Sequence, residues 1–195
     1  MVKSISKEEL AALPVETFPG RIILIQSHAE AEKAAQYLSG FDKVGFDSET
    51  RPTFRKGKLN KIALIQLSTE DTCFLFRTNI IGIPDCLSDI LTSDRIMKIG
   101  VSVHDDISAI NGRRKMRTDD FIDLQKMVKA YGIEDASLQR IYAILFGKRI
   151  TKGQRLSNWE TDVLSDAQKQ YAAIDAWACL RIYYELQRIK LGGNK

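Results

Sequence analysis

The sequence predicts an α/β fold in which helices flank a mixed sheet. Three strand-like runs, at 43–47, 61–68 and 72–77, follow one another with polar, turn-like stretches between them. Strands and helices then alternate, and helical periodicity dominates from about residue 123 onward. Consecutive strands, then alternation, then helices are typical of a mixed sheet that carries helices on its faces.

The remaining elements follow from local signals. Further strands are predicted at 21–26, 96–101 and 121–124. Helices are predicted at 6–12, 29–39, 85–92, 104–111 and, as the longest, about 166–190. Pro14 ends the first helix and Gly40 closes the second, because proline cannot continue a helix and glycine favours the turn that follows one.

Composition and length favour one packed domain. The chain has 195 residues, of which 44% are hydrophobic and 28% charged, so a packed core is expected and disorder is not. No apolar run reaches bilayer length and the N-terminus lacks the apolar segment of a secretion signal, so we expect no membrane partner and a cytoplasmic location. Three scattered cysteines and two histidines make a structural zinc site improbable.

Basic residues gather in three runs, within 51–61, 113–117 and 148–155, and the net charge is +4. Each run alone could be a solvated loop. Because all three lie near the acids described next, they favour a surface that faces phosphates.

Asp47 and Glu49 come at the end of the strand-like run VGF. Residues i and i+2 of a strand point to the same side, so both carboxylates can converge on one point. The alternative is a strand that simply ends in polar residues.

Asp175 is the one charge in the ten-residue segment YAAIDAWACL, and helical spacing would bury it on almost any face. A buried carboxylate is costly unless it is paired, protonated or bound to metal. Tyr171 lies one helical turn earlier on the same face, so its hydroxyl can reach the same site. The alternative is a carboxylate that Arg181 or a cap satisfies.

Asp105 and Asp106 lie near the start of the helix predicted at 104–111. Acids at a helix N-terminus often only complement the helix dipole, which is the alternative here. Asp106 shares a face with Ile110, which directs it inward, whereas Asp105 is expected to face solvent.

Such a set suits the hydrolysis of phosphodiesters. Two hard cations, ~3.5–4 Å apart, can activate a water and stabilise both the phosphoryl oxygens and the leaving group. They take oxygen ligands, chiefly carboxylates. A tyrosine, with a pKa of ~10, is a poor base at neutral pH but can orient a water. The roles of three further residues are open. Trp159 stacks on a base or, as we expect, packs in the core. His104 contacts phosphate or is only a surface residue, and Phe54 guides the nucleic-acid strand or lies in a solvated loop.

Three motifs in order resemble those of the DEDD superfamily of 3′→5′ exonucleases, in its tyrosine-bearing, RNase D-like DEDDy branch. VGFDSET resembles the first motif, KIGVSVHDDISAI the second and YAAIDAWA the third. The flanking stretches KIALIQLS and LSNWETDVLSDAQKQYAAIDAWA resemble the Werner-type exonuclease domains of this branch. The spacing of the second motif selects Asp106 over Asp105.

This resemblance implies a fold and a set of roles. The fold is RNase H-like, a five-stranded sheet of order 3-2-1-4-5 with an antiparallel second strand, in one domain over 1–195 with its core at about 20–190. Asp47, Glu49, Asp106 and Asp175 would bind two divalent cations, Mg²⁺ or Mn²⁺. Tyr171 would position the attacking water. The partner would be the 3′ end of DNA or RNA, released as nucleoside 5′-monophosphates.

Two other functions remain open from the sequence. A non-catalytic nucleic-acid-binding module would keep the fold without cleavage, although converging carboxylates would repel a phosphate backbone if no metal were bound. A protein-interaction domain would bind no nucleic acid even at low salt.

Overall fold

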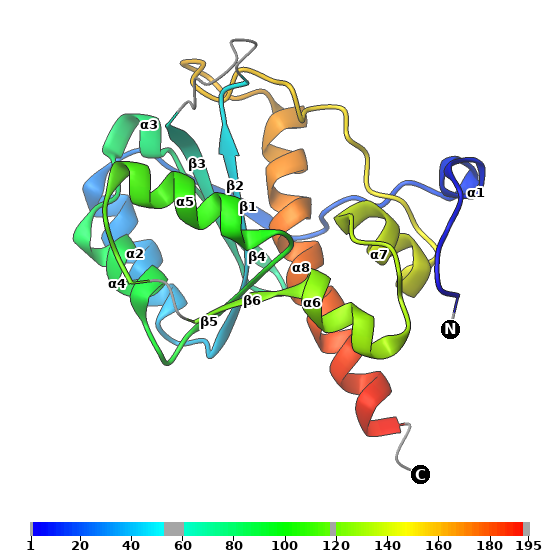
Figure 1. Ribbon diagram of the computed structural model, residues 1–195. Coiled ribbons are helices and arrows are strands. Elements are labelled where there is room, and N and C mark those ends of the chain that lie inside the picture. Colours follow the sequence, from blue (N-terminus) through cyan, green and yellow to red (C-terminus); the bar gives the residue numbers. More distant parts are fainter. Residues whose placement is uncertain (1, 53–60, 118–119, 193–195) are drawn as a thin grey trace.

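The computed structural model describes residues 2–52, 61–117 and 120–192 (Figure 1). The strands are β1 (Arg21–Ile25), β2 (Lys43–Thr50), β3 (Ile62–Ser68), β4 (Thr72–Phe76), β5 (Met97–Gly100) and β6 (Phe121–Asp123). The helices are α1 (Lys7–Ala12), α2 (His28–Leu38), α3 (Thr78–Ile81), α4 (Asp85–Thr92), α5 (Val103–Arg113), α6 (Leu124–Val128), the 3₁₀ turn η1 (Lys129–Tyr131), α7 (Leu138–Phe146) and α8 (Asp166–Gly192).

The strands form one mixed sheet in the order β1-β4-β3-β2-β5-β6. Strand β3 is antiparallel to both β2 and β4, and the remaining neighbours are parallel. If β2 to β6 are counted as first to fifth, the order is 3-2-1-4-5 with an antiparallel second strand, as the family resemblance implied. The α/β fold is confirmed.

The expected count of five strands is wrong, because β1 joins the sheet as a sixth strand. It lies parallel to β4 from Arg21 opposite Thr72 to Ile25 opposite Phe76. The largely apolar segment RIILI thereby pairs with the outer edge of β4, which would otherwise expose unpaired backbone groups.

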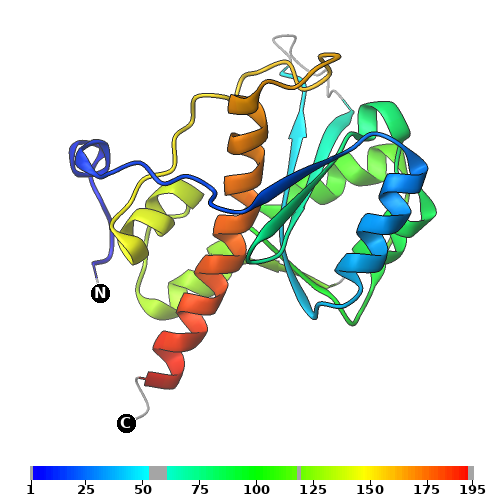
Figure 2. The ribbon, with the colours of Figure 1, turned by 180° about the vertical axis from the view of Figure 1, so that it is seen from behind.

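Helices cover both faces of the sheet (Figures 1 and 2). Helix α8 crosses one face over β2 to β5, together with α6 and α7, and α2, α4 and α5 lie on the other face. Each face has its own cluster of buried apolar side chains. The site described below lies where α8 passes β2.

Gly45 allows this close passage. A Cβ atom at Gly45 would lie 1.9 Å from the carbonyl oxygen of Ala176, so only glycine fits without moving α8. Since Asp175 directly precedes Ala176, the contact also brings its carboxylate to the strand that carries Asp47.

Element boundaries differ from the sequence-based ones at two places that matter for the site. Strand β2 continues to Thr50 because its pairing with β3 persists past Asp47, which is opposite Gln66. Helix α5 begins at Val103, directly after Ser102, whose φ of 61° places it in the left-handed region. The short helix α3 was not predicted.

The cysteines are free thiols, and Cys73 and Cys179 are buried. No helix within the described ranges is long and apolar enough to span a bilayer.

Candidate active site

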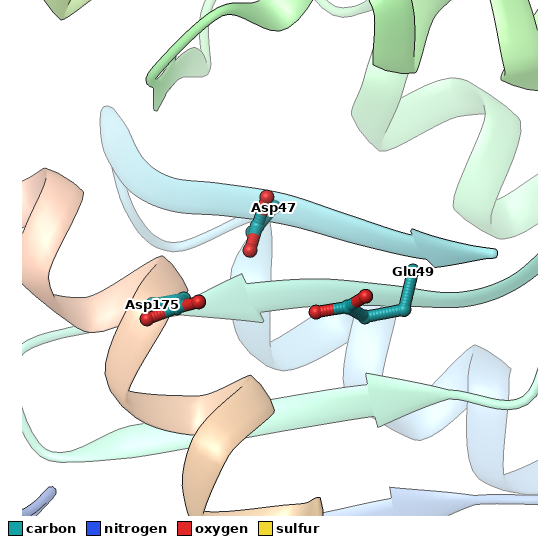
Figure 3. Close-up of side chains that lie close together, drawn as sticks. All are labelled: Asp47, Glu49 and Asp175. Carbon is teal, nitrogen blue, oxygen red and sulfur yellow. The ribbon is translucent and has the colours of Figure 1, made fainter. Parts of the chain in front are cut away.

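Three carboxylates meet between β2 and α8. One oxygen from each of Asp47, Glu49 and Asp175 lies within 4.8 Å of the others. Figure 3 shows the two side chains of β2 and that of α8 converging on one point. The alternation of the strand aligns Asp47 with Glu49, and the contact at Gly45 brings Asp175 to them. The three acids thus form one cluster.

Burial makes this cluster electrostatically unfavourable without a cation. Desolvation raises the pKa of Asp47, Glu49 and Asp175 above the ordinary range of carboxyl groups. Repulsion from the neighbouring acids raises the pKa of Asp47 and Glu49 further. Like charges in a poorly solvated site cannot all ionise together. Oxygen donors of this kind fit a hard divalent cation, which would relieve the repulsion.

Asp106 reaches the same region from α5. Its Oδ1 accepts a hydrogen bond from the hydroxyl of Ser48, the residue between Asp47 and Glu49. Its charge contributes to the raised pKa of Asp47, so it lies within electrostatic reach of the cluster. It is not one of the three acids whose oxygens lie within 4.8 Å of one another. Asp106 is therefore placed beside the cluster, on the opposite side of β2.

Asp105 and His104 have exposed side chains and lie outside the three-acid cluster. The side chain of Asp105 is 92% exposed and that of His104 91%, and the two lie 3.5 Å apart. The structure therefore places Asp106, and not Asp105, among the acids. His104 is a surface residue.

Tyr171 lies one turn before Asp175 on α8 and is largely buried. A hydrogen bond from its hydroxyl lowers the pKa of Asp175 and partly offsets the effect of burial. Burial and the surrounding acids raise the pKa of Tyr171 above its ordinary value. The phenol therefore stays protonated at neutral pH and acts as a hydrogen-bond donor. Trp159 is fully buried and its ring centre lies 6.0 Å from that of Tyr171, so it packs rather than stacking on a base.

Arg181 does not neutralise Asp175, so that alternative is wrong. Its Nη1 donates to Oε2 of Glu16 at 3.1 Å, and its guanidinium lies 4.5 Å from the centre of the Phe146 ring. Within the part of the chain that the structure describes, Oδ1 of Asp175 has no hydrogen-bond partner.

Comparison with known proteins shows the family of this chain. A family model described as 3′-5′ exonuclease matches residues 22–190. The chain belongs to the 3′-5′ exonuclease family. It is 33% identical over 184 residues to the mouse bifunctional 3′-5′ exonuclease/ATP-dependent helicase WRN, and 31% identical over 190 residues to a 3′-5′ exonuclease of Arabidopsis thaliana. These matches confirm the resemblance to the RNase D-like, Werner-type branch.

The chain spans only part of the length of these relatives. The match covers 89% of the chain in both cases, but 13% of the mouse protein and 66% of the Arabidopsis protein. The Nibbler EXO domain of Aedes aegypti has the same fold, with a TM-score of 0.78 at 23% identity over 91% of this chain and 94% of that domain.

Three cations of the predicted phosphate-facing runs make contacts within the fold. Arg114 pairs with Asp85 at 2.7 Å, and Lys148 pairs with Glu16 at 3.1 Å. The guanidinium of Arg149 donates to the carbonyl of Leu13 at 3.0 Å. These three side chains are therefore held by partners within the fold, and whether they face phosphates stays a prediction. Phe54, Arg55, Lys56 and Lys58 lie outside the described residues.

Lys152 and Arg155 are different, because their charges act on the cluster. Lys152 lowers the pKa of Asp175, and Arg155 lowers that of Glu49. Both come from the segment between α7 and α8. Both cations therefore act electrostatically on the cluster.

A groove of about 740 Å³ opens beside Asp106. It is lined by Ser48, Thr50, Arg51, Pro52, Lys61, Asp105, Asp106, Ser108, Ala109 and Gly112. Sequence reasoning did not assign a role to Ser48, although strand alternation already places it on the opposite face from Asp47.

Proposed function

We propose that this chain, as one domain over 1–195, removes nucleotides from the 3′ end of DNA or RNA with two divalent cations, Mg²⁺ or Mn²⁺. The products are nucleoside 5′-monophosphates. The observation that carries the proposal is the cluster of Asp47, Glu49 and Asp175, whose oxygens lie within 4.8 Å of one another. The family assignment supports both the reaction and its direction.

The roles of the acids follow from their positions. Asp47, Glu49 and Asp175 would hold one cation, and Asp47 together with Asp106 would hold the second, because Asp106 approaches β2 from its other side. Bound divalent cations supply a more acidic water and neutralise phosphoryl charge. The hydroxyl of Tyr171, protonated at neutral pH, would orient the attacking water as a donor or acceptor.

The substrate would lie between the cluster and the groove beside Asp106. Lys61 lies in the wall of this groove, and Lys152 and Arg155 face the acids from the segment before α8. A polyanion entering here would meet cations on both sides of the carboxylates. This arrangement reduces the repulsion that four acids would otherwise exert on phosphates.

The test is digestion of 3′-labelled and 5′-labelled oligonucleotides, of DNA and of RNA, single- and double-stranded. Mg²⁺ or Mn²⁺ is expected to release labelled mononucleotide from the 3′ end only, and excess EDTA is expected to abolish release. Asp175→Asn is expected to lose activity, whereas Asp166→Asn on the same helix should keep it, since the Asp166 side chain is 97% exposed and pairs only with Lys169 among the described residues. Full activity in EDTA would contradict the proposal.

A non-catalytic binding module makes the opposite prediction. Oligonucleotides would then bind tightly and survive incubation with either cation. That outcome, with correctly folded protein, would replace the proposed hydrolysis.

A further inference from the structure

Gln66 is a polar residue in the middle of the fully buried strand β3. Its side chain is 0% exposed, and the other strand residues from Ile62 to Leu67 are apolar. Neither its Oε1 nor its Nε2 has a hydrogen-bond partner among the described residues. A buried amide that makes no hydrogen bond costs free energy, so its presence here requires an explanation.

The register of the sheet directs Gln66 toward the acids. In the antiparallel pairing of β2 with β3, Gln66 lies directly opposite Asp47. Side chains of directly opposed residues project from the same face of a sheet, with their Cβ atoms about 4.5–5.5 Å apart. The amide therefore extends on the face of Asp47, which is the face that α8 and Asp175 cover.

The other unpartnered buried atoms of the described residues belong to a member of the cluster and to a residue that packs against Tyr171. In the described ranges, the remaining buried side-chain atoms without a partner are Oδ1 of Asp175 and Nε1 of Trp159. Asp175 belongs to the carboxylate cluster, and Trp159 packs against Tyr171. Unsatisfied polar atoms thus gather around the cluster. An unsatisfied buried polar group in a native structure requires an explanation, and a cation held by the neighbouring carboxylates supplies one.

We propose that Gln66 is a positioning residue of the metal site, an inference that rests on the proposed function. With a divalent cation bound, its Nε2 would donate to the carboxylate of Asp47 and so orient that ligand. Groups that orient metal ligands in this way commonly contribute about 10- to 100-fold to metal affinity. Without the cation, the amide lowers the stability of the protein.

The test uses Gln66→Met, which keeps the length of the side chain and removes its polar atoms. Mn²⁺ binding is measured by calorimetry, and thermal unfolding is measured in EDTA. We expect about tenfold weaker Mn²⁺ binding and a melting temperature in EDTA that is unchanged or higher, because an apolar isostere removes the unpaired amide. Gln66→Leu serves if the methionine variant does not fold.

Gln168→Met is the matched control. Gln168 is also buried but has partners, since its Oε1 accepts from the backbone of Ser165 at 3.0 Å and its Nε2 donates to the carbonyl of Asn158 at 3.3 Å. Its replacement is expected to lower the melting temperature in EDTA. An unchanged or higher melting temperature for Gln66→Met and a lower one for Gln168→Met would separate a functional amide from a structural one.

The outcomes distinguish this inference from the proposed function. Normal Mn²⁺ binding by the wild-type protein, together with unchanged binding by Gln66→Met, overturns the inference alone. A fall in melting temperature like that of Gln168→Met, with unchanged Mn²⁺ binding, does the same. A wild-type protein that binds no Mn²⁺ overturns the proposed function and this inference with it.

Discussion

The hydroxyl of Ser48 donates a hydrogen bond to Oδ1 of Asp106 and so links β2 to α5. Ser48 lies between Asp47 and Glu49, and strand alternation turns it to the opposite face. Strand β2 therefore directs two carboxylates toward α8 and one hydroxyl toward α5.

Ser48→Ala is expected to weaken the second cation site and spare the first. Without the hydroxyl, the carboxylate of Asp106 can rotate, and loss of such an orienting hydrogen bond costs roughly 10-fold or more in metal affinity. Mn²⁺ titration followed by electron paramagnetic resonance would resolve the two binding steps. Ser39→Ala, which removes an exposed hydroxyl bonded to the carbonyl of Gln36, is the control. Equal weakening of both steps would contradict the assignment of Ser48.

The metal-free protein is expected to lose stability as pH rises from the ordinary carboxyl range, about 4, through the raised pKa of Asp175 at about 7. The raised pKa values of Asp47 and Asp175 mean that the folded state binds more protons than the unfolded state above the ordinary carboxyl range. Stability then falls with increasing pH, because the unfolded state binds fewer protons. Melting curves in EDTA should show a drop of several degrees across this window. Saturating Mn²⁺ should reduce the drop, since cation binding stabilises the folded state.

Asp47→Asn supplies the internal check on that pH dependence. The amide removes one titrating group of the cluster, so the melting temperature in EDTA should vary less with pH than in the wild-type protein. An equally steep decline in this variant would assign the effect to other groups.

Arg181→Met is expected to lower the free energy of unfolding by about 1–2 kcal/mol through lost hydrogen bonds and ring contacts. The guanidinium of Arg181 donates a hydrogen bond to Glu16 and lies 4.9 Å from the centre of the Trp177 ring. Mn²⁺ affinity should not change, because Arg181 does not pair with Asp175. Urea unfolding and calorimetry measure the two quantities. A substantial change in Mn²⁺ affinity would show that Arg181 is coupled to the cluster after all.

Ser102→Gly is expected to stabilise the protein by about 0.5–1 kcal/mol, because left-handed backbone is unfavourable for residues with a Cβ atom. Ser102 has a φ of 61°, and its side chain makes no capping hydrogen bond to α5. Its backbone N–H donates to Oδ1 of Asp123 at 3.1 Å, and glycine keeps this bond. Urea unfolding checks the gain. Ser137→Gly, at the start of α7 with a φ of −85°, should give no gain; equal gains at both positions would point to another cause.

Several features followed from local sequence. The helix at 85–92 matches α4, and the long final helix matches α8, because apolar spacing and boundary residues act over short distances. The strand that carries Asp47 was predicted too short, since its continuation to Thr50 depends on pairing with β3. The added strand β1 was predicted as a strand, but its place in the sheet depends on a partner 51 residues away, as Arg21 lies opposite Thr72.

By itself, the sequence determined the chemistry available to this protein: acids at Asp47, Glu49, Asp106 and Asp175, each placed by strand or helix periodicity. Tertiary structure decided how those acids are arranged. The close approach at Gly45 brings Asp175 to β2, Ser48 holds Asp106 on the other side, and Arg181 is bound by Glu16 instead of Asp175. Periodicity specifies the direction of a side chain within its own element, whereas partners from distant segments are selected only when the elements pack.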